Sequence, residues 1–283
     1  MSSRSPRRQR SRAGALALGL VAVSAAALAG LPGMGGGPLR ICADPDNPPF
    51  SQADATGFEN RLATMLADAL GTKARFYWWP QRRGFVRNTL DAKACDVVIA
   101  MPVDSPGVLT TPAWYEAGYV FAYRPDRVGR IGSYDDAALR TLRVGVPLVG
   151  NDMAATPPGH ALARRGLTDN VIGFAPLGQT SVGERMMAAL ADGSIDVALL
   201  WAPQAAYFAG RQDFAVRLAP ARDDSAAEPQ RFAMAVAVRQ GDVALRDALA
   251  DALARLKPRI GELLADAGVA DAATSPTPVA RRP

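Results

Sequence analysis

Residues 39–50, LRICADPDNPPF, decide which fold this chain can adopt. Four of the first five residues are apolar, which is typical of a short strand buried on both faces. The Asp, Asn and Pro residues that follow end the strand and begin a loop. A helix is predicted next over residues 58–70, where apolar residues such as Leu62 and Leu66 recur at helical spacing. A buried strand, a loop and a helix in this order predict a β–α–β unit and therefore a parallel sheet.

The alternation of strand and helix patterns continues along most of the chain. Short apolar runs predict strands over residues 39–43, 74–79, 96–101, 119–123, 142–146, 171–174, 195–201, 214–218 and 232–238. Longer amphipathic runs predict helices over residues 58–70, 84–91, 136–139, 158–165, 182–191, 203–209, 243–256 and 259–267. Such alternation predicts an α/β fold whose sheets are covered by helices on both faces.

The N-terminal segment, residues 1–29, has the pattern of a secretory signal. It carries five Arg and no acidic residue before an apolar run rich in Ala and Gly. The small residues at Ala27 and Ala29 predict cleavage after Ala29. A retained anchor is the alternative, although the run is short and weakly apolar for a stable membrane span. We expect a Gly-rich linker over residues 30–38 and a Pro-rich tail over residues 271–283, both disordered.

Charge and composition exclude several classes of function. The formal net charge of +5 first suggests an anionic partner such as nucleic acid. Removing the five signal arginines leaves 27 basic and 27 acidic residues, so the exported body is neutral and binding to nucleic acid loses its support. Two Cys and one His cannot form a thiolate zinc site or a multi-His metal centre. No phosphate-binding loop or nucleophile elbow is present, so we expect no metal, no cofactor and no enzyme activity.

Several segments together carry a family resemblance over roughly residues 38–270. The opening strand and loop, the GFE sequence that starts the first helix, and the strand passages at 90–101, 193–200 and 235–242 resemble extracellular solute-binding proteins of family 3, the amino-acid-binding type. The resemblance implies a type II periplasmic binding protein, with two α/β lobes around a cleft joined by a two-strand hinge. It places lobe 1 at residues 39–125 and 231–270 and lobe 2 at residues 126–230. The chain would cross after Tyr123 and return near Phe232.

A narrower resemblance rests on unusual strings. WWPQRRGFVRNTL at residues 78–90, TPPGHALA at 156–163 and WAPQAAYF at 201–208 resemble the quinoprotein-dehydrogenase-associated J proteins. This implies a periplasmic accessory protein that aids assembly or activation of a methanol or alcohol dehydrogenase dependent on pyrroloquinoline quinone. The dehydrogenase would be the partner, with its c-type cytochrome a second candidate. One departure concerns Pro112, because the family pattern has this proline one residue later.

The clamp for an amino-acid ligand is missing from the expected positions. Such a ligand needs an Arg for its carboxylate and an acid for its ammonium group. Family spacing places these at Val108 and Trp201, which can supply neither charge. Burying a zwitterion there would leave unpaired charges at a cost of several kcal/mol. We therefore predict that the ligand, if there is one, is not an ordinary amino acid.

Other side chains remain candidates for the cleft. Each is polar or aromatic and follows a predicted strand or starts a predicted helix: Asp44, Phe50, Trp79, Arg82, Arg83, Asp104, Thr156 and Trp201. Asp44 has an equal alternative as a loop cap. Arg82 and Arg83, with Arg87, could bind an acidic ligand or surface, or be a solvated helix start. Thr156 suits an N-cap, and the helix start there could bind an anion or be plainly capped.

The two cysteines have three alternatives. In the implied fold, Cys42 lies in the first strand and Cys95 just before its parallel neighbour, which would bring the two within bridging range. An oxidising periplasm favours a disulfide. Two buried thiols are the second alternative. A catalytic cysteine is the third, but no base is nearby in the sequence.

Three function hypotheses follow. The first is the dehydrogenase accessory protein. The second is a receptor that delivers a small solute to an ABC permease through closure of two lobes. The third is an enzyme built on this scaffold, for which Asp44, Glu59, Asp104 and His160 offer no spacing that marks an acid–base pair.

Overall fold

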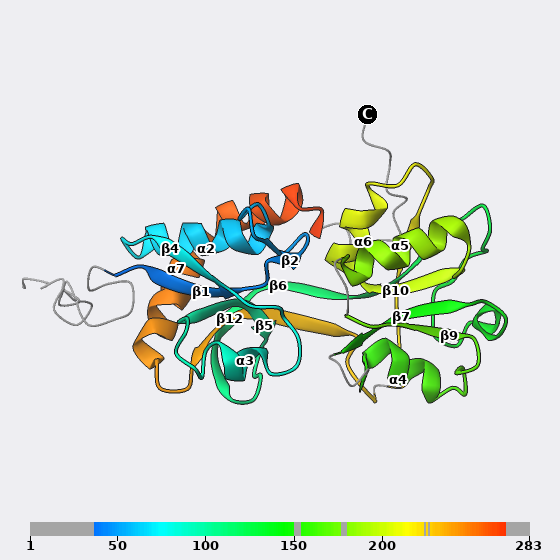
Figure 1. Ribbon diagram of the computed structural model, residues 1–283, viewed down its shortest axis with the longest axis horizontal. Coiled ribbons are helices and arrows are strands. Elements are labelled where there is room, and N and C mark those ends of the chain that lie inside the picture. Colours follow the sequence, from blue (N-terminus) through cyan, green and yellow to red (C-terminus); the bar gives the residue numbers. More distant parts are fainter. Residues whose placement is uncertain (1–36, 150–153, 177–179, 224, 226, 270–283) are drawn as a thin grey trace, which may run out of the picture.

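The computed structural model describes residues 37–149, 154–176, 180–223, 225 and 227–269. These residues form two α/β lobes joined by long strands (Figure 1), so the predicted two-lobe architecture is confirmed. The predicted signal (1–29), nearly all of the predicted linker (30–38) and the predicted tail (271–283) lie outside the described residues.

The first lobe is built on a mixed sheet with strand order β4-β1-β5-β12-β6. Strand β1 pairs in parallel with β4 and β5, while β12 pairs antiparallel with β5 and β6. The strand bounds are β1 Leu39–Ala43, β4 Ala74–Trp78, β5 Val97–Pro102, β6 Val108–Tyr123 and β12 Arg231–Arg239. Because β1 and β5 are buried on both faces, their sequences are almost continuously apolar.

Helices cover the two faces of this sheet. Helix α2, Phe58–Ala69, and helix α7, Val243–Asp266, pack their apolar sides on one face. The short helix α3, Phe85–Asn88, lies on the other face beside both cysteines.

The second lobe repeats this plan around strand β10. Strand β10 pairs antiparallel with β6 and parallel with β7, which in turn pairs with β8 and β9. Figure 1 shows α5 and α6 above this sheet and α4 below it. The bounds are β7 Val144–Val149, β8 Ala154–Ala155, α4 Pro157–Ala163, β9 Val171–Phe174, α5 Val182–Asp192, β10 Val197–Trp201, α6 Ala202–Ala209 and β11 Arg217–Pro220.

Strand β6 belongs to both lobes. Its residues 108–118 pair with β12 of the first lobe, whereas residues 119–123 pair with β10 and β11 of the second. The chain therefore changes lobes near Gly118, which differs from the predicted crossing after Tyr123. The sequence showed only the last, most continuously apolar part of this strand, because residues 109–118 mix buried, partly buried and exposed positions without a regular period.

The C-terminal helix corrects one prediction. Two helices were expected, over 243–256 and 259–267, because Pro258 normally breaks a helix at a cost of about 3 kcal/mol. The structure has one helix, α7, with Pro258 inside it. Leu253, Leu256 and Ile260 continue one buried stripe past the proline, so packing on the sheet outweighs the local cost.

Other bounds differ at the ends of elements. The helix predicted over 84–91 is only the four-residue α3, because turns follow Asn88. The helix predicted over 136–139 is a single 3-10 turn, Ala137–Arg140, whose N-cap Asp136 accepts a hydrogen bond from the backbone N–H of Ala138. The strand predicted over 214–218 starts later, as β11. Three two-residue strands were too short for a sequence pattern: β2 Asp46–Asn47, β3 Ser51–Gln52 and β8.

An Arg–Asp pair joins β1 to the start of β5 in the first lobe, and an equivalent pair joins the starts of β7 and β10 in the second. In the first lobe the buried carboxylate of Asp96 accepts hydrogen bonds from Arg40 Nε (2.9 Å) and Nη2 (2.6 Å). In the second lobe Asp196 accepts from Arg143 Nε (3.0 Å) and Nη2 (2.9 Å). Both aspartates precede a central strand, so the same kind of ion pair holds the start of that strand in both lobes.

Candidate binding site at the junction of the two lobes

Aromatic rings from both lobes meet where the hinge strands pass. Trp201, at the end of β10, lies 5.2 Å from the ring of Tyr119 and 5.9 Å from that of Phe232. The Trp201 side chain also packs against the hydrophobic core of the first lobe, which contains Tyr115. We call Tyr115, Tyr119, Trp201 and Phe232 the junction cluster. The sequence predicted only Trp201 here, because the three partners lie in the hinge strands and follow no motif.

Phe50 lies behind the junction cluster in the first-lobe core. It is 7% exposed, and its ring is 5.2 Å from that of Phe58. Phe58 in turn contacts Tyr115 edge to face at 6.0 Å. Phe50 therefore supports the cluster from inside.

Glu59 is an acidic residue whose carboxyl has a strongly raised pKa, as carboxyls at functional sites often do. It is the second residue of α2, directly after Phe58, and it is partly exposed. Burial raises the pKa of its carboxyl to about 8, and the nearby Asp44 carboxylate adds to the rise. Burial also raises the pKa of Tyr115, with a further contribution from Glu59. The sequence marked Glu59 only as one of four unpaired acid–base candidates.

Asp44 takes the capping role that was one of its two alternatives. Its carboxylate accepts hydrogen bonds from the backbone N–H of Asp46 (2.9 Å) and of Gln81 (2.6 Å). The carboxylate thus joins the loop after β1 to the loop after β4. Contact with a ligand remains a prediction.

A hydrogen bond crosses directly from helix α6 of the second lobe to strand β2 of the first. Gln204 Nε2, in α6 of the second lobe, donates to Asn47 Oδ1 at 3.2 Å. Asn47 Nδ2 donates to Gln81 Oε1 at 3.3 Å. The loops after β1 and β4 therefore lie at the edge of the lobe junction.

Three more of the predicted residues lie with Asp44 on this edge or beside it. Trp79 is partly exposed and stacks on Tyr77 with ring centroids 6.5 Å apart. Arg82 and Arg83 follow in an exposed turn before α3. The structure thus groups Asp44, Trp79, Arg82 and Arg83 within one pair of adjoining loops.

Asp104 and Thr156 are not grouped with them by any contact among the described residues. Asp104 is exposed in a turn with φ 59°, and its backbone N–H donates to Thr110 Oγ1 at 3.3 Å. Thr156 stands at the predicted N-cap position of α4, but its buried hydroxyl donates to the Pro147 carbonyl at 2.9 Å instead of capping the helix.

The two positions of the missing amino-acid clamp are filled by apolar packing. Val108 is 7% exposed and packs in the cluster around the disulfide. Trp201 belongs to the junction cluster described above. Neither position offers a charge to a zwitterion, which agrees with the sequence argument.

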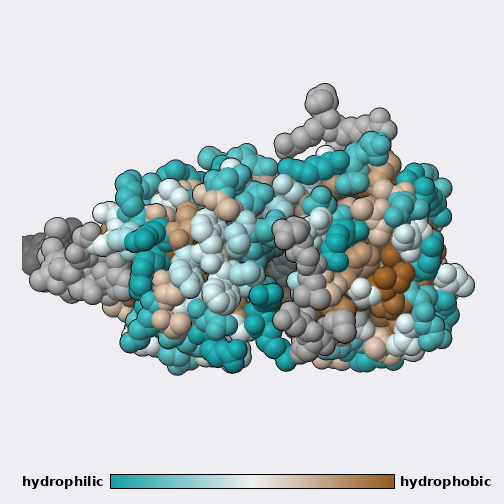
Figure 2. All heavy atoms as spheres, viewed as in Figure 1, coloured by the Kyte–Doolittle hydropathy of each residue, from teal (hydrophilic) through white to brown (hydrophobic). Residues whose placement is uncertain are grey.

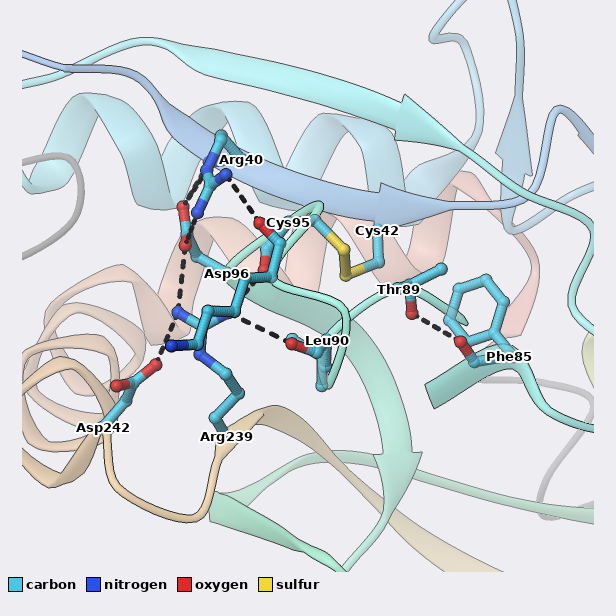
Figure 3. Close-up of a disulfide and its surroundings, with 10 residues drawn as sticks. Arg40, Cys42, Phe85, Thr89, Leu90, Cys95, Asp96, Arg239 and Asp242 are labelled. Atoms are coloured by element: carbon cyan, nitrogen blue, oxygen red, sulfur yellow. Dashed lines mark hydrogen bonds and ion pairs between the residues drawn. A yellow bond between two sulfur atoms is a disulfide. The ribbon is translucent and has the colours of Figure 1, made fainter. Parts of the chain in front are cut away.

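The disulfide between Cys42 and Cys95 is present, with a Cα–Cα distance of 5.4 Å (Figure 3). Below it in the figure, Arg239 Nη1 donates to the Cys95 carbonyl at 2.6 Å and Nη2 pairs with Asp96 at 3.1 Å. Burial alone would raise the pKa of Asp96, but the hydrogen bonds from Arg40 and Arg239 outweigh it and lower the pKa.

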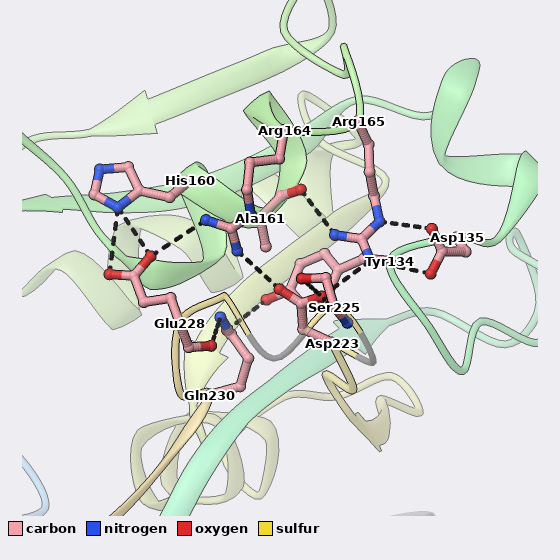
Figure 4. A network of polar contacts seen from close by, with 10 residues as sticks. All are labelled: Tyr134, Asp135, His160, Ala161, Arg164, Arg165, Asp223, Ser225, Glu228 and Gln230. Carbon is pink, nitrogen blue, oxygen red and sulfur yellow. Dashed lines mark hydrogen bonds and ion pairs between the residues drawn. The ribbon is translucent and has the colours of Figure 1, made fainter.

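A second polar network lies inside the second lobe (Figure 4). The buried Asp223 carboxylate pairs with Arg164 (2.8 Å) and Arg165 (3.0 Å), both in the turn after α4. Burial opposes ionisation of Asp223, but hydrogen bonds from Ser225 and these arginines hold its pKa well below the ordinary range. His160, one of the four acid–base candidates from the sequence, has its Nδ1 3.0 Å from Glu228 Oε2. The network anchors the return segment before β12, so we assign it a structural role.

The comparisons with known proteins decide the family. No protein-family model matches the chain. MoxJ of Methylorubrum extorquens is 35% identical to it over 250 residues, which cover 82% of this chain and 81% of that protein. The chain belongs to the MoxJ family.

Solved structures extend the comparison to the fold. The periplasmic binding protein XoxJ of Methylobacterium extorquens AM1 is 31% identical, with a TM-score of 0.67, and the match covers 82% of this chain and 97% of that one. An ancestral cationic amino acid solute binding protein is 22% identical with a TM-score of 0.64, covering 81% and 94%, and this likeness shows the fold alone. This member of the MoxJ family therefore has the type II periplasmic binding protein fold.

The surface of this MoxJ-family chain is mixed. Figure 2 shows a brown patch on the second lobe. Val149 (41% exposed) and Ile172 (39% exposed) are large apolar residues of that lobe that are exposed. Among the described residues, no helix is both long and apolar enough to cross a membrane. The same part of the chain contains no group of three or more His, Cys, Asp or Glu side chains that could hold a metal ion.

Proposed function

We propose that this protein acts in the periplasm as an accessory protein that binds a quinone-dependent alcohol or methanol dehydrogenase and aids its assembly or activation. Membership of the MoxJ family and the likeness to a periplasmic binding protein support this proposal. The observation that carries it is the junction cluster: where a transport receptor for amino acids would hold charges, this chain has Trp201 packed among rings and Val108 in the core. A junction filled by packed aromatic rings suits a scaffold that binds a polypeptide.

Export to the periplasm is part of the proposal. The five arginines and apolar run of residues 1–29 would direct it, and the disulfide requires an oxidising compartment.

Capture from periplasmic extract tests the proposal. The full exported chain, immobilised through its C-terminus, should retain the dehydrogenase, and a strain lacking this chain should show reduced dehydrogenase activity at unchanged dehydrogenase transcript level. If the chain retains no dehydrogenase but shows a saturable thermal shift with a small solute, the accessory role is wrong.

Delivery of a small solute to an ABC permease is the second candidate. The hydrogen bond from Gln204 to Asn47 favours it, because polar contacts between lobes are what a closed receptor uses to hold its cleft shut. This role predicts a thermal shift with a solute that is not an ordinary amino acid, and no retained dehydrogenase.

A further inference from the structure

Strand β4 forms one edge of the first-lobe sheet. It pairs with β1 on one side and, among the described residues, with no strand on the other. None of its five residues is buried, whereas four of the five residues of β1 are. An edge strand with free backbone groups tends to recruit another strand, so proteins either protect such an edge or use it.

The aromatic side chains of this edge are held in fixed positions. Phe76 and Trp78 stack with ring centroids 5.0 Å apart and an interplanar angle of 14°. Tyr77 and Trp79 stack with an angle of 6°. Since side chains alternate along a strand, one pair lies on each face of β4. Rings already fixed by stacking lose little conformational entropy when a partner covers them.

Exposed arginines lie on this edge strand and in the segment that follows it. Arg75 on β4, Arg82 in the next turn and Arg87 in α3 are exposed, and no ion pair to them is found within the described part of the chain. The neighbouring Asp44 carboxylate accepts backbone N–H groups instead. The edge therefore combines Trp, Tyr and Arg, the residues that dominate binding energy at protein interfaces, with an excess of positive charge.

We propose that the outer edge of β4, with Trp78, Trp79, Arg75, Arg82 and Arg87, is a docking surface for an extended acidic segment of a protein partner, which adds as a further strand. The partner's backbone would pair with the edge, and its acidic side chains would meet the arginines. A second copy of this chain fits less well, because edge-to-edge pairing would place like charges opposite each other. The inference rests on the proposed function in that the dehydrogenase would supply this segment.

Charge reversal tests the surface against a matched control. The double variant Arg82→Glu/Arg87→Glu should bind the purified dehydrogenase at least tenfold more weakly than the unaltered chain at 50 mM NaCl, and its affinity should depend less on salt. The control Arg255→Glu/Arg259→Glu makes the same charge change at exposed positions of α7 and should bind within about threefold of the unaltered chain. Equal binding by the two double variants would overturn the proposal.

A second measurement does not depend on the dehydrogenase. The chain has four Trp residues, so its indole N–H signals can be resolved and assigned by NMR. Poly-L-glutamate should shift the signals of Trp78 and Trp79 but not those of Trp114 and Trp201, and poly-L-lysine should shift none. If poly-L-glutamate leaves the Trp78 and Trp79 signals unchanged, the surface is wrong even if the dehydrogenase binds. If the shifts appear but no dehydrogenase is bound, the accessory function fails and the surface stands.

Discussion

Replacing Glu59 by Gln should remove a pH dependence of stability that the fold imposes. The raised pKa means that the folded chain holds this proton up to about pH 8, whereas the unfolded chain releases it near the ordinary value of 4.5. Between these two values the folded state binds more protons than the unfolded state. The free energy of unfolding therefore falls as pH rises through this window and levels off above pH 8.

The magnitude follows from the difference between the two pKa values. A change from 4.5 to about 8 corresponds to about 5 kcal/mol. Two effects reduce it: Glu59 is partly exposed, so water can approach when it ionises, and the N-terminal turn of α2 stabilises a carboxylate by up to ~1 kcal/mol. Between pH 5 and pH 9, the free energy of unfolding of the unaltered chain should fall by about 2–3 kcal/mol more than that of Glu59→Gln.

Urea unfolding at pH 5, 7 and 9 measures this difference. Glu59→Gln should match the unaltered chain at pH 5 within about 1 kcal/mol and be the more stable of the two at pH 9. Glu262→Gln, at an exposed position of α7, serves as the control and should follow the unaltered chain at every pH. A difference between Glu59→Gln and the unaltered chain that stays constant from pH 5 to pH 9 would refute the reasoning.

Three further predictions concern stability. Replacing Cys42 and Cys95 by Ser removes a bridge with a sequence separation of 53 residues and should cost about 4 kcal/mol in urea unfolding; an unchanged midpoint would contradict this. Asp96→Asn leaves two arginines facing a buried neutral group and should cost about 3–5 kcal/mol, so a calorimetric shift of only 1 °C would count against it. Gly57→Ala would place a methyl group 2.2 Å from the Phe50 carbonyl oxygen and should cost about 2 kcal/mol, and wild-type stability of this variant would disprove the close approach.

The sequence predicted element bounds well for strands that are buried on both faces and for the amphipathic helix α2. Strand β1, strand β5 and helix α2 appear close to their predicted bounds, because a continuous apolar run or a helical apolar stripe is a local signal. The Arg–Asp pairs and the full length of β6 left no such signal. Their energy comes from contacts between residues more than 50 positions apart, such as the 2.6 Å bond from Arg40 to Asp96.

The candidate site shows the same division. The sequence determined that Val108 and Trp201, the two positions where the family resemblance places the amino-acid clamp, carry no charge at any geometry. It also determined that residues 1–29 carry five Arg and no acidic residue, whereas it left a disulfide as one of three alternatives for Cys42 and Cys95. Only the tertiary structure decided that Asp44 caps two loops and that Tyr115, Tyr119 and Phe232 surround Trp201. The physical reason is that residue type fixes which interactions are possible, while the neighbours that desolvate, pair or stack a side chain are set by how distant strands meet at the hinge.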